Sequence, residues 1–241
     1  MKIKYCLLLL CLFQTLTFTG QDHQFKSWTA INYDLELNKK WEIDFGLQLR
    51  LKENLEALDS YIAQTETSFM PLKRLKLSMQ LRYYRKNDNQ GKQQGFDNFF
   101  RYRFGIQKQF KLKPGTFNLR LAYQNRLSLD RNRFESEEEW LAYGKRTKKV
   151  FRVKPALHLK IKNWSYDPLF YFEYFQEMDD TGVSLSEDRA KAYRYGIGTK
   201  IKLSKNQSLS VVYFYEKSES LLEPNQYASV LSLKYNFKHN K

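Results

Sequence analysis

Charged side chains recur at alternating positions along this chain, and arginines and carboxylates in such a pattern could pair with each other or bind ions. Ten of them stand out: Asp44, Arg50, Glu66, Arg82, Arg101, Arg103, Arg120, Arg152, Glu173 and Arg194. A planar guanidinium can pair with a carboxylate through two parallel hydrogen bonds, and either group attracts ions of opposite charge. Because charges removed from water must be paired or solvated, we expect these residues to form one charge network on a common face.

Residues suited to covalent catalysis are scarce. The histidines after residue 20 are His23, His158 and His239, and no serine-bearing motif marks a partner for any of them. Glu173 and Glu177 are close in sequence, but a pair of carboxylates alone does not imply hydrolysis. The sequence contains no phosphate-binding loop and no metal-ligand spacing. We therefore predict no catalytic residue, no cofactor and no metal site, and expect that the protein is not an enzyme.

Residues 41–52 show how the charges are positioned. The odd positions from Trp41 to Leu51 are apolar, and the even positions from Glu42 to Lys52 are charged or polar except for Gly46. Successive side chains of a strand point to opposite faces, so this pattern predicts a strand with one apolar and one ionic face. In a soluble sheet the apolar face packs on a core, whereas in a membrane barrel it meets lipid and the ionic face lines the lumen.

The same alternation recurs along the chain, and no region has sustained helical spacing, so the fold class is all-β. The predicted strands are 31–37, 41–52, 60–70, 75–84, 100–107, 117–124, 151–161, 167–177, 193–203, 207–216 and 226–237. Short, basic connections alternate with longer, more acidic ones, which predicts an antiparallel transmembrane β-barrel with short periplasmic turns and longer outer loops. Because bacterial single-chain barrels usually have an even number of strands, we expect about 12 strands (10–12), with residues 21–27 adding the first.

Residues 1–20 predict a signal peptide. Lys2 and Lys4 precede an apolar run at 5–13, and small or polar residues follow. Cys6 and Cys11 both lie in this segment, so the exported chain, a single domain over 21–241, has no thiol for disulfides or catalysis. Export also argues against nucleic acid as a partner, despite a formal net charge of +15. No exported stretch approaches the roughly 20 apolar residues of a spanning helix, so membrane insertion requires a barrel.

The two ends of the predicted barrel carry further signals. Trp28 and Trp41 lie near strand ends, as expected of the aromatic girdle of a membrane barrel. The chain ends in VLSLKYNFKHNK, an alternating strand with aromatics at Tyr235 and Phe237. This segment is similar to the C-terminal signal of outer-membrane barrels. The expected partners are the barrel-assembly machinery, outer-membrane lipid and lipopolysaccharide, and the expected location is the outer membrane.

Several segments resemble a known family. They are WTAINYDLELNKKWEIDFGLQLRL, QLRYYRK, FFRYRFGIQKQF and RYGIGTKIKLSKNQSLSVVYFYEK. These resemble domain-of-unknown-function family 2490, over nearly the whole chain after residue 20. The resemblance implies an outer-membrane β-barrel of Gram-negative bacteria. It implies no activity and no catalytic residues.

The ionic face leads to two interpretations of the lumen. One is a structural barrel closed by a salt-bridged network, and the other is a narrow passage that favours anions, because basic residues outnumber acidic ones on this face. Further residues expected there include Arg74, Arg126, Lys154, Lys160 and Glu216. Two alternatives remain open. One is an outer-membrane lipid-modifying enzyme with a Ser–His pair near the membrane rim, and the other is a soluble periplasmic ligand-binding barrel with its apolar face inside.

Overall fold

The computed structural model describes residues 23–88, 95–129, 147–161, 166–178, 190–219 and 225–240. These residues form eleven strands and one short 3₁₀ helix, η1 (Glu53–Leu55). The strands are β1 (His23–Glu36), β2 (Trp41–Lys52), β3 (Ala57–Leu72), β4 (Leu75–Asp88), β5 (Gly95–Lys111), β6 (Gly115–Ser128), β7 (Lys148–Leu159), β8 (Tyr166–Glu177), β9 (Lys191–Lys202), β10 (Gln207–Glu219) and β11 (Gln226–Asn240). The predicted signal peptide over 1–20 lies outside the described residues, as do parts of several connections between strands, among them 130–146 and 179–189.

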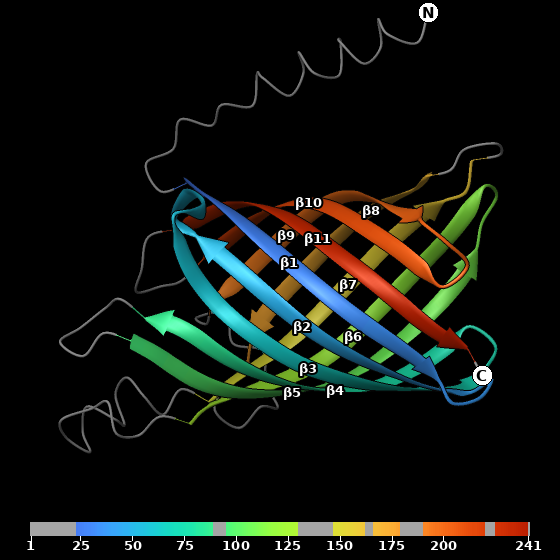
Figure 1. Ribbon diagram of the computed structural model, residues 1–241, viewed down its shortest axis with the longest axis horizontal. Coiled ribbons are helices and arrows are strands. Elements are labelled where there is room, and N and C mark those ends of the chain that lie inside the picture. The colour runs from blue at the N-terminus through green and yellow to red at the C-terminus, as the bar shows by residue number, and fades with distance from the viewer. Residues whose placement is uncertain are drawn as a thin grey trace, which may run out of the picture.

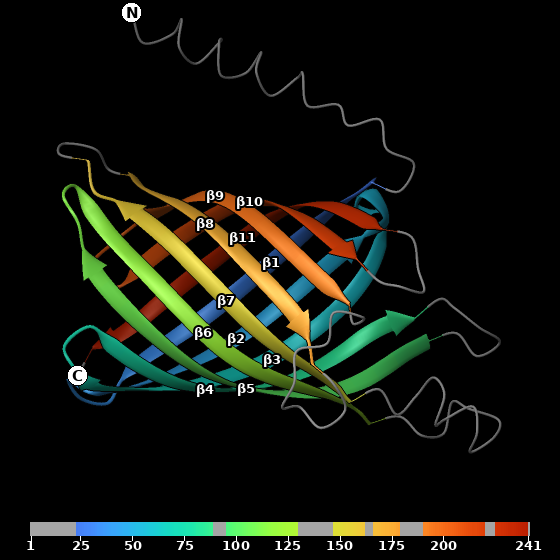
Figure 2. The ribbon, with the colours of Figure 1, turned by 180° about the vertical axis from the view of Figure 1, so that it is seen from behind.

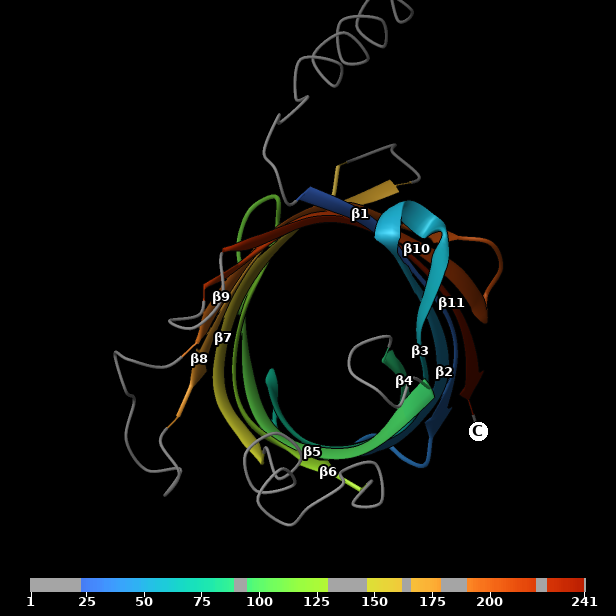
Figure 3. The same cartoon turned by 90° about the vertical axis from the view of Figure 1, so that its left-hand side faces the viewer.

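The strands close into a single barrel (Figures 1 and 2). Each strand pairs with its neighbours in chain order, and β1 pairs with β11 to complete the ring, which Figure 3 shows from one end. Consecutive strands are antiparallel. The β1–β11 seam is parallel and runs from His23 opposite Tyr227 to Glu36 opposite Asn240. With an odd number of strands, the first and last must point the same way.

This closure corrects two expectations. Residues 23–27 lengthen β1 and do not form a strand of their own, so the described barrel has eleven strands, within the expected range of 10–12 but without the added first strand. The barrel is also not antiparallel throughout, because the first and last strands run in the same direction. An even number of strands is expected when the first and last strands pair antiparallel. In this chain they pair parallel, so the number of strands is odd.

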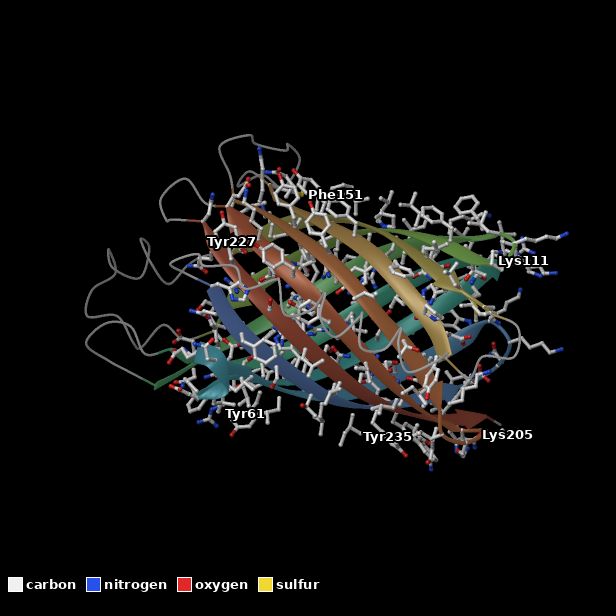
Figure 4. All side chains as sticks on the ribbon, turned by 90° about the horizontal axis from the view of Figure 1, so that it is seen from above. Tyr61, Lys111, Phe151, Lys205, Tyr227 and Tyr235 are labelled. Atoms are coloured by element: carbon white, nitrogen blue, oxygen red, sulfur yellow. The ribbon has the colours of Figure 1, made fainter. Side chains whose placement is uncertain are left out.

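The predicted sorting of the connections is only partly present. Residues 129–147 and 178–190 separate strands at one end, and the two-residue turn 73–74 lies at the other. However, β2 and β3 are separated by residues 53–56 alone, because β3 begins at Ala57, three residues earlier than the alternation predicted. Connection 160–165 at the turn end is also as long as 89–94 at the opposite end. Figure 4 places Lys111 and Lys205 at the turn end and Tyr61 and Tyr227 at the other.

The alternation of residues 41–52 sets the two faces of β2. Leu47 is 66% exposed on the outer face, whereas its neighbour Gly46 is buried and Arg50 lies over the inward-pointing Trp28. The same division continues around the barrel, and large apolar side chains such as Ile31, Phe104 and Ile197 are exposed on the outside. No helix among the described residues has the length and apolar character needed to cross a membrane.

A small apolar cluster lies on the inner side of the seam region. Phe214 and Val230 are almost fully buried, and Trp28 packs edge-on against Phe214 with a centroid distance of 4.9 Å. The position of Trp28 near a strand end predicts a place in the outer aromatic girdle. This prediction is wrong, because Trp28 points inward. Trp41 does lie on the outer face, where it is 42% exposed and stacks on Phe69 at 4.6 Å.

Candidate functional site

The candidate site is a belt of charged side chains on the inner face of the barrel. We define the lumenal charge belt as Arg50, Arg82, Arg101, Arg103, Arg120, Arg152, Lys154, Arg194, Glu66, Glu173 and Glu216. Eight cations face three carboxylates, which leaves five positive charges in excess. Strand register decides how these charges are distributed, because it places residues of neighbouring strands side by side.

Glu173 is the centre of one half of the belt. Its side chain is 3% exposed, and four cations from β6, β7 and β9 approach it. Arg152 Nη2 lies 2.5 Å from Oε1 and Arg120 Nη2 3.4 Å from the same oxygen. Lys154 Nζ and Arg194 Nη1 lie 3.6 Å and 3.9 Å from Oε2. A buried carboxylate with this many cationic partners compensates charges that would otherwise be buried together.

Two more carboxylates complete the compensated part of the belt. Arg194 also donates through Nε to Glu216, which lies directly opposite on β10. Glu66 on β3 accepts a hydrogen bond from Arg103 Nη2 at 2.6 Å and one from Gln80 Nε2 at 3.0 Å. Every carboxylate of the belt is thus hydrogen-bonded to an arginine, as buried charged groups require.

The remaining belt members, Arg50, Arg82 and Arg101, are all cations. Register places Arg82 opposite Arg101, and Arg101 opposite Arg126 on β6. Like charges directly opposite each other in a sheet are destabilising. Within the described ranges, Arg50, Arg82 and Arg101 form no ion pair with a carboxylate. They donate instead to the neutral amide oxygens of Gln48, Gln64 and Gln80, respectively.

Aromatic rings hold several of these cations in place. The guanidinium of Arg50 lies 3.8 Å from the ring centroid of Trp28, and those of Arg152 and Arg194 lie 4.6 Å from that of Phe175. A cation over the face of a ring is attracted by its quadrupole, and the attraction strengthens when water is excluded. The belt is therefore positioned by stacking as well as by ion pairs.

All ten residues predicted for the charge network lie on the inner face, and nine belong to the belt. The exception is Asp44, whose carboxylate accepts two hydrogen bonds from Asn32, at 3.0 Å and 2.8 Å. Lys154 and Glu216 join the belt, as their position on the ionic face predicted. Arg74 and Lys160 do not, because they fall in the connections after β3 and β7, where alternation no longer determines direction.

Register also creates contacts that the sequence pattern did not reveal. His23 on β1 places Nε2 3.0 Å from the Oγ of Ser229 on β11, and the hydroxyl of Tyr213 lies 2.7 Å from the same oxygen. The two ends of the chain meet here only because β1 and β11 pair. Ser229 is 7% exposed. Among the residues that the structure describes, no carboxylate contacts His23, and no cluster of histidine, cysteine and acidic residues could hold a metal ion.

Comparison with known proteins places the chain in a family without assigning a role. No curated protein and no solved structure matches it. A family model described as "Protein of unknown function (DUF2490)" matches residues 25–223, from the third residue of β1 to the connection before β11. This span includes every member of the lumenal charge belt. The chain therefore belongs to the DUF2490 family, as the resemblance of its amphipathic segments had indicated.

Proposed function

We propose that this protein is an integral outer-membrane β-barrel whose lumen is a narrow passage that favours anions. The observation that carries the proposal is the excess of five positive charges in the lumenal charge belt. Rings of charged side chains select ions of the opposite sign. An uncompensated buried charge costs several kcal/mol, so the excess cations need water or anions beside them.

The outer wall supports the membrane part of the proposal. Large apolar side chains on every side of the barrel are exposed, among them Ile31 at 63%, Leu47 at 66% and Tyr195 at 55%. A soluble ligand-binding barrel would bury such residues and expose the charged ones. Each strand has between 12 and 17 residues, more than the roughly 9–11 that a tilted membrane strand needs.

The partners follow from this location. We propose contacts with outer-membrane lipid and lipopolysaccharide around the wall, and with the barrel-assembly machinery during insertion; nucleic acid is not among them. The two-residue turn and its neighbours would face the periplasm. Because β1 and β11 are parallel, the first residue of β1 and the last residue of β11 then lie at opposite faces of the membrane.

The membrane assignment can be tested by labelling single cysteines on β2. We expect Gln48→Cys to react with a membrane-impermeant thiol reagent from the aqueous lumen, and Leu47→Cys to be protected by lipid. The two positions are adjacent and differ only in the face of the strand, so each controls for the other. Strong aqueous labelling at position 47 with none at position 48 would favour the soluble barrel.

The passage can be tested with purified protein in a planar bilayer under a salt gradient. We expect the reversal potential to lie closer to the equilibrium potential of the anion than to that of the cation. A reversal potential on the cation side would refute the charge argument. A barrel that inserts but conducts nothing would instead support a closed, salt-bridged scaffold.

The pair of His23 and Ser229 is the one observation that favours a second function, a lipid-modifying enzyme. A serine hydroxyl hydrogen-bonded to an imidazole can act as a nucleophile, but catalysis also requires a group that orients the imidazole. His23 has no such carboxylate partner among the described residues. We therefore expect no fatty-acid release from phospholipid vesicles that depends on Ser229. Release that Ser229→Ala abolishes, in a variant that still folds, would reverse this conclusion.

A further inference from the structure

We propose that the lumen contains a discrete binding site for a phosphate-type oxoanion, formed by Arg50, Arg82 and Arg101. We call these three residues the arginine triad. The inference deepens the proposed passage, on which it rests, by naming the chemical class of ligand that the inner face would take. It starts from the unequal distribution of charge within the belt.

The triad converges on one buried tyrosine. Tyr84 is 9% exposed, and the guanidinium carbons of Arg50, Arg82 and Arg101 lie 6.0, 5.5 and 5.1 Å from its ring centroid. Arg82 Nη1 also donates a hydrogen bond to the Tyr84 hydroxyl at 3.0 Å. Three cations are therefore held around a common point by strands β2, β4 and β5.

Among the residues that the structure describes, no carboxylate forms an ion pair with the triad. In the part of the chain that the structure describes, the triad's hydrogen-bond acceptors are the three glutamines and Tyr84. The contrast with Glu173 is direct, because there one carboxylate has four cationic partners. Neutral amides orient a guanidinium but leave its charge uncompensated, and no described carboxylate balances it, so we assign the balance to an anion bound from outside the protein.

Unused donors point to an oxoanion in particular. The Nε atoms of Arg82 and Arg101 are buried and have no hydrogen-bond partner. The same holds for Arg103 and Arg152, but those two guanidinium groups already have a carboxylate partner. Arg82 and Arg101 are directly opposite each other in the β4–β5 register, an arrangement that is unfavourable without a shared counter-ion. A guanidinium group can donate two parallel N–H hydrogen bonds to two different oxygens of a phosphate. Chloride is a single atom and cannot accept such a pair in this way.

Unfolding of the full-length barrel in detergent micelles tests the site, with inorganic phosphate as the probe. A ligand that binds only the folded state raises the free energy of unfolding as its concentration rises. We expect a saturable stabilisation by phosphate that chloride at the same ionic strength does not produce. Arg101→Gln should raise the phosphate concentration at half-effect by about tenfold, the order expected for losing a hydrogen bond to a charged group.

A matched control and a second readout separate binding from folding. Arg85→Gln removes an exposed arginine on the outer face of the same strand as Arg82, and should leave the phosphate effect unchanged. Without phosphate, Arg101→Gln should be at least as stable as the natural chain, because it removes a like-charge pair. A short-chain phosphatidic acid added in place of phosphate tests the lipid source of the same group, and should stabilise less than free phosphate.

The outcomes distinguish the site from the passage. No phosphate-specific stabilisation of the natural chain, or an unchanged phosphate dependence in Arg101→Gln, would overturn the arginine triad as a binding site, whatever the reversal potential. A reversal potential on the cation side, with the phosphate effect intact, would overturn the passage alone. Greater stabilisation by the phosphatidic acid than by free phosphate would overturn the assignment to a free oxoanion.

Discussion

Replacing Glu173 with glutamine is expected to lower the free energy of unfolding by about 3–5 kcal/mol, the range for removing one partner of a buried ion pair. The substitution keeps the shape of the side chain and removes only its charge. Arg120, Arg152, Lys154 and Arg194 would then share a site that is 3% exposed with no carboxylate at its centre. Of these four cations, only Arg194 would keep a carboxylate partner, Glu216.

Unfolding of the refolded barrel in micelles by guanidinium chloride measures this effect. The comparison requires that the free energy of unfolding depend on denaturant concentration with the same slope in both proteins. Glu42→Gln is the matched control. Glu42 also faces inward and pairs with a single lysine, Lys76, at 3.1 Å, but its side chain is 25% exposed. We expect a loss of no more than about 1 kcal/mol there, because partly solvated pairs contribute little.

A double variant tests whether the loss arises from uncompensated charge. Arg152→Gln removes the closest cation, which lies 2.5 Å from Glu173. If charge imbalance causes the loss, the combined variant should be more stable than the sum of the two single losses predicts, by about 1–3 kcal/mol. Additive losses, or equal losses in the Glu173 and Glu42 variants, would contradict the central role given to Glu173.

The two faces of the wall could be predicted from sequence because period-two alternation is a local property. The position of each residue in the alternation predicts that Leu47 faces outward and Arg50 inward, and the structure confirms both. The same rule placed all ten predicted charges on the inner face. It failed at Arg74 and Lys160, since a turn interrupts the alternation on which the rule depends.

The partners of each charge could not be predicted, because they depend on register between strands. Alternation within each strand shows that Arg82 and Arg101 both face inward, but not that they lie directly opposite each other. It also could not show that Glu173 would meet four cations while the arginine triad would meet no described carboxylate. Register is set by turns and by packing of whole strands, which a single sequence encodes only weakly.

Closure of the barrel is a property of the whole chain, and it was the least predictable feature. Eleven amphipathic segments could be counted, but the general preference for even numbers led to an expectation of about twelve. The parallel pairing of β1 with β11 then brought His23 to Ser229, residues that lie almost a full chain length apart. Any sequence signal for that contact would have required knowing which two strands form the seam.

Changing the charge of Arg101 is expected to reduce the anion preference of the lumen in graded steps. Arg101→Gln lowers the excess of the belt from five positive charges to four, and Arg101→Glu lowers it to three. Because selectivity follows the charge on the lining, the second variant should shift the reversal potential about twice as far toward the cation side as the first. Glutamate at this position would lie opposite Arg82 and next to Arg126 in register, so it gains ionic partners and should not prevent folding.

Planar-bilayer recordings of the three proteins under one salt gradient provide the measurement, and low ionic strength gives the largest difference because salt screens the lining charges. Arg85→Glu is the control, since it makes the same change of two charges on the outer face of β4 and should leave the reversal potential unchanged. Equal reversal potentials in the natural chain and Arg101→Glu would mean that ions do not pass the arginine triad. Equal shifts in Arg101→Glu and Arg85→Glu would mean that overall protein charge, and not the inner face of β5, determines selectivity.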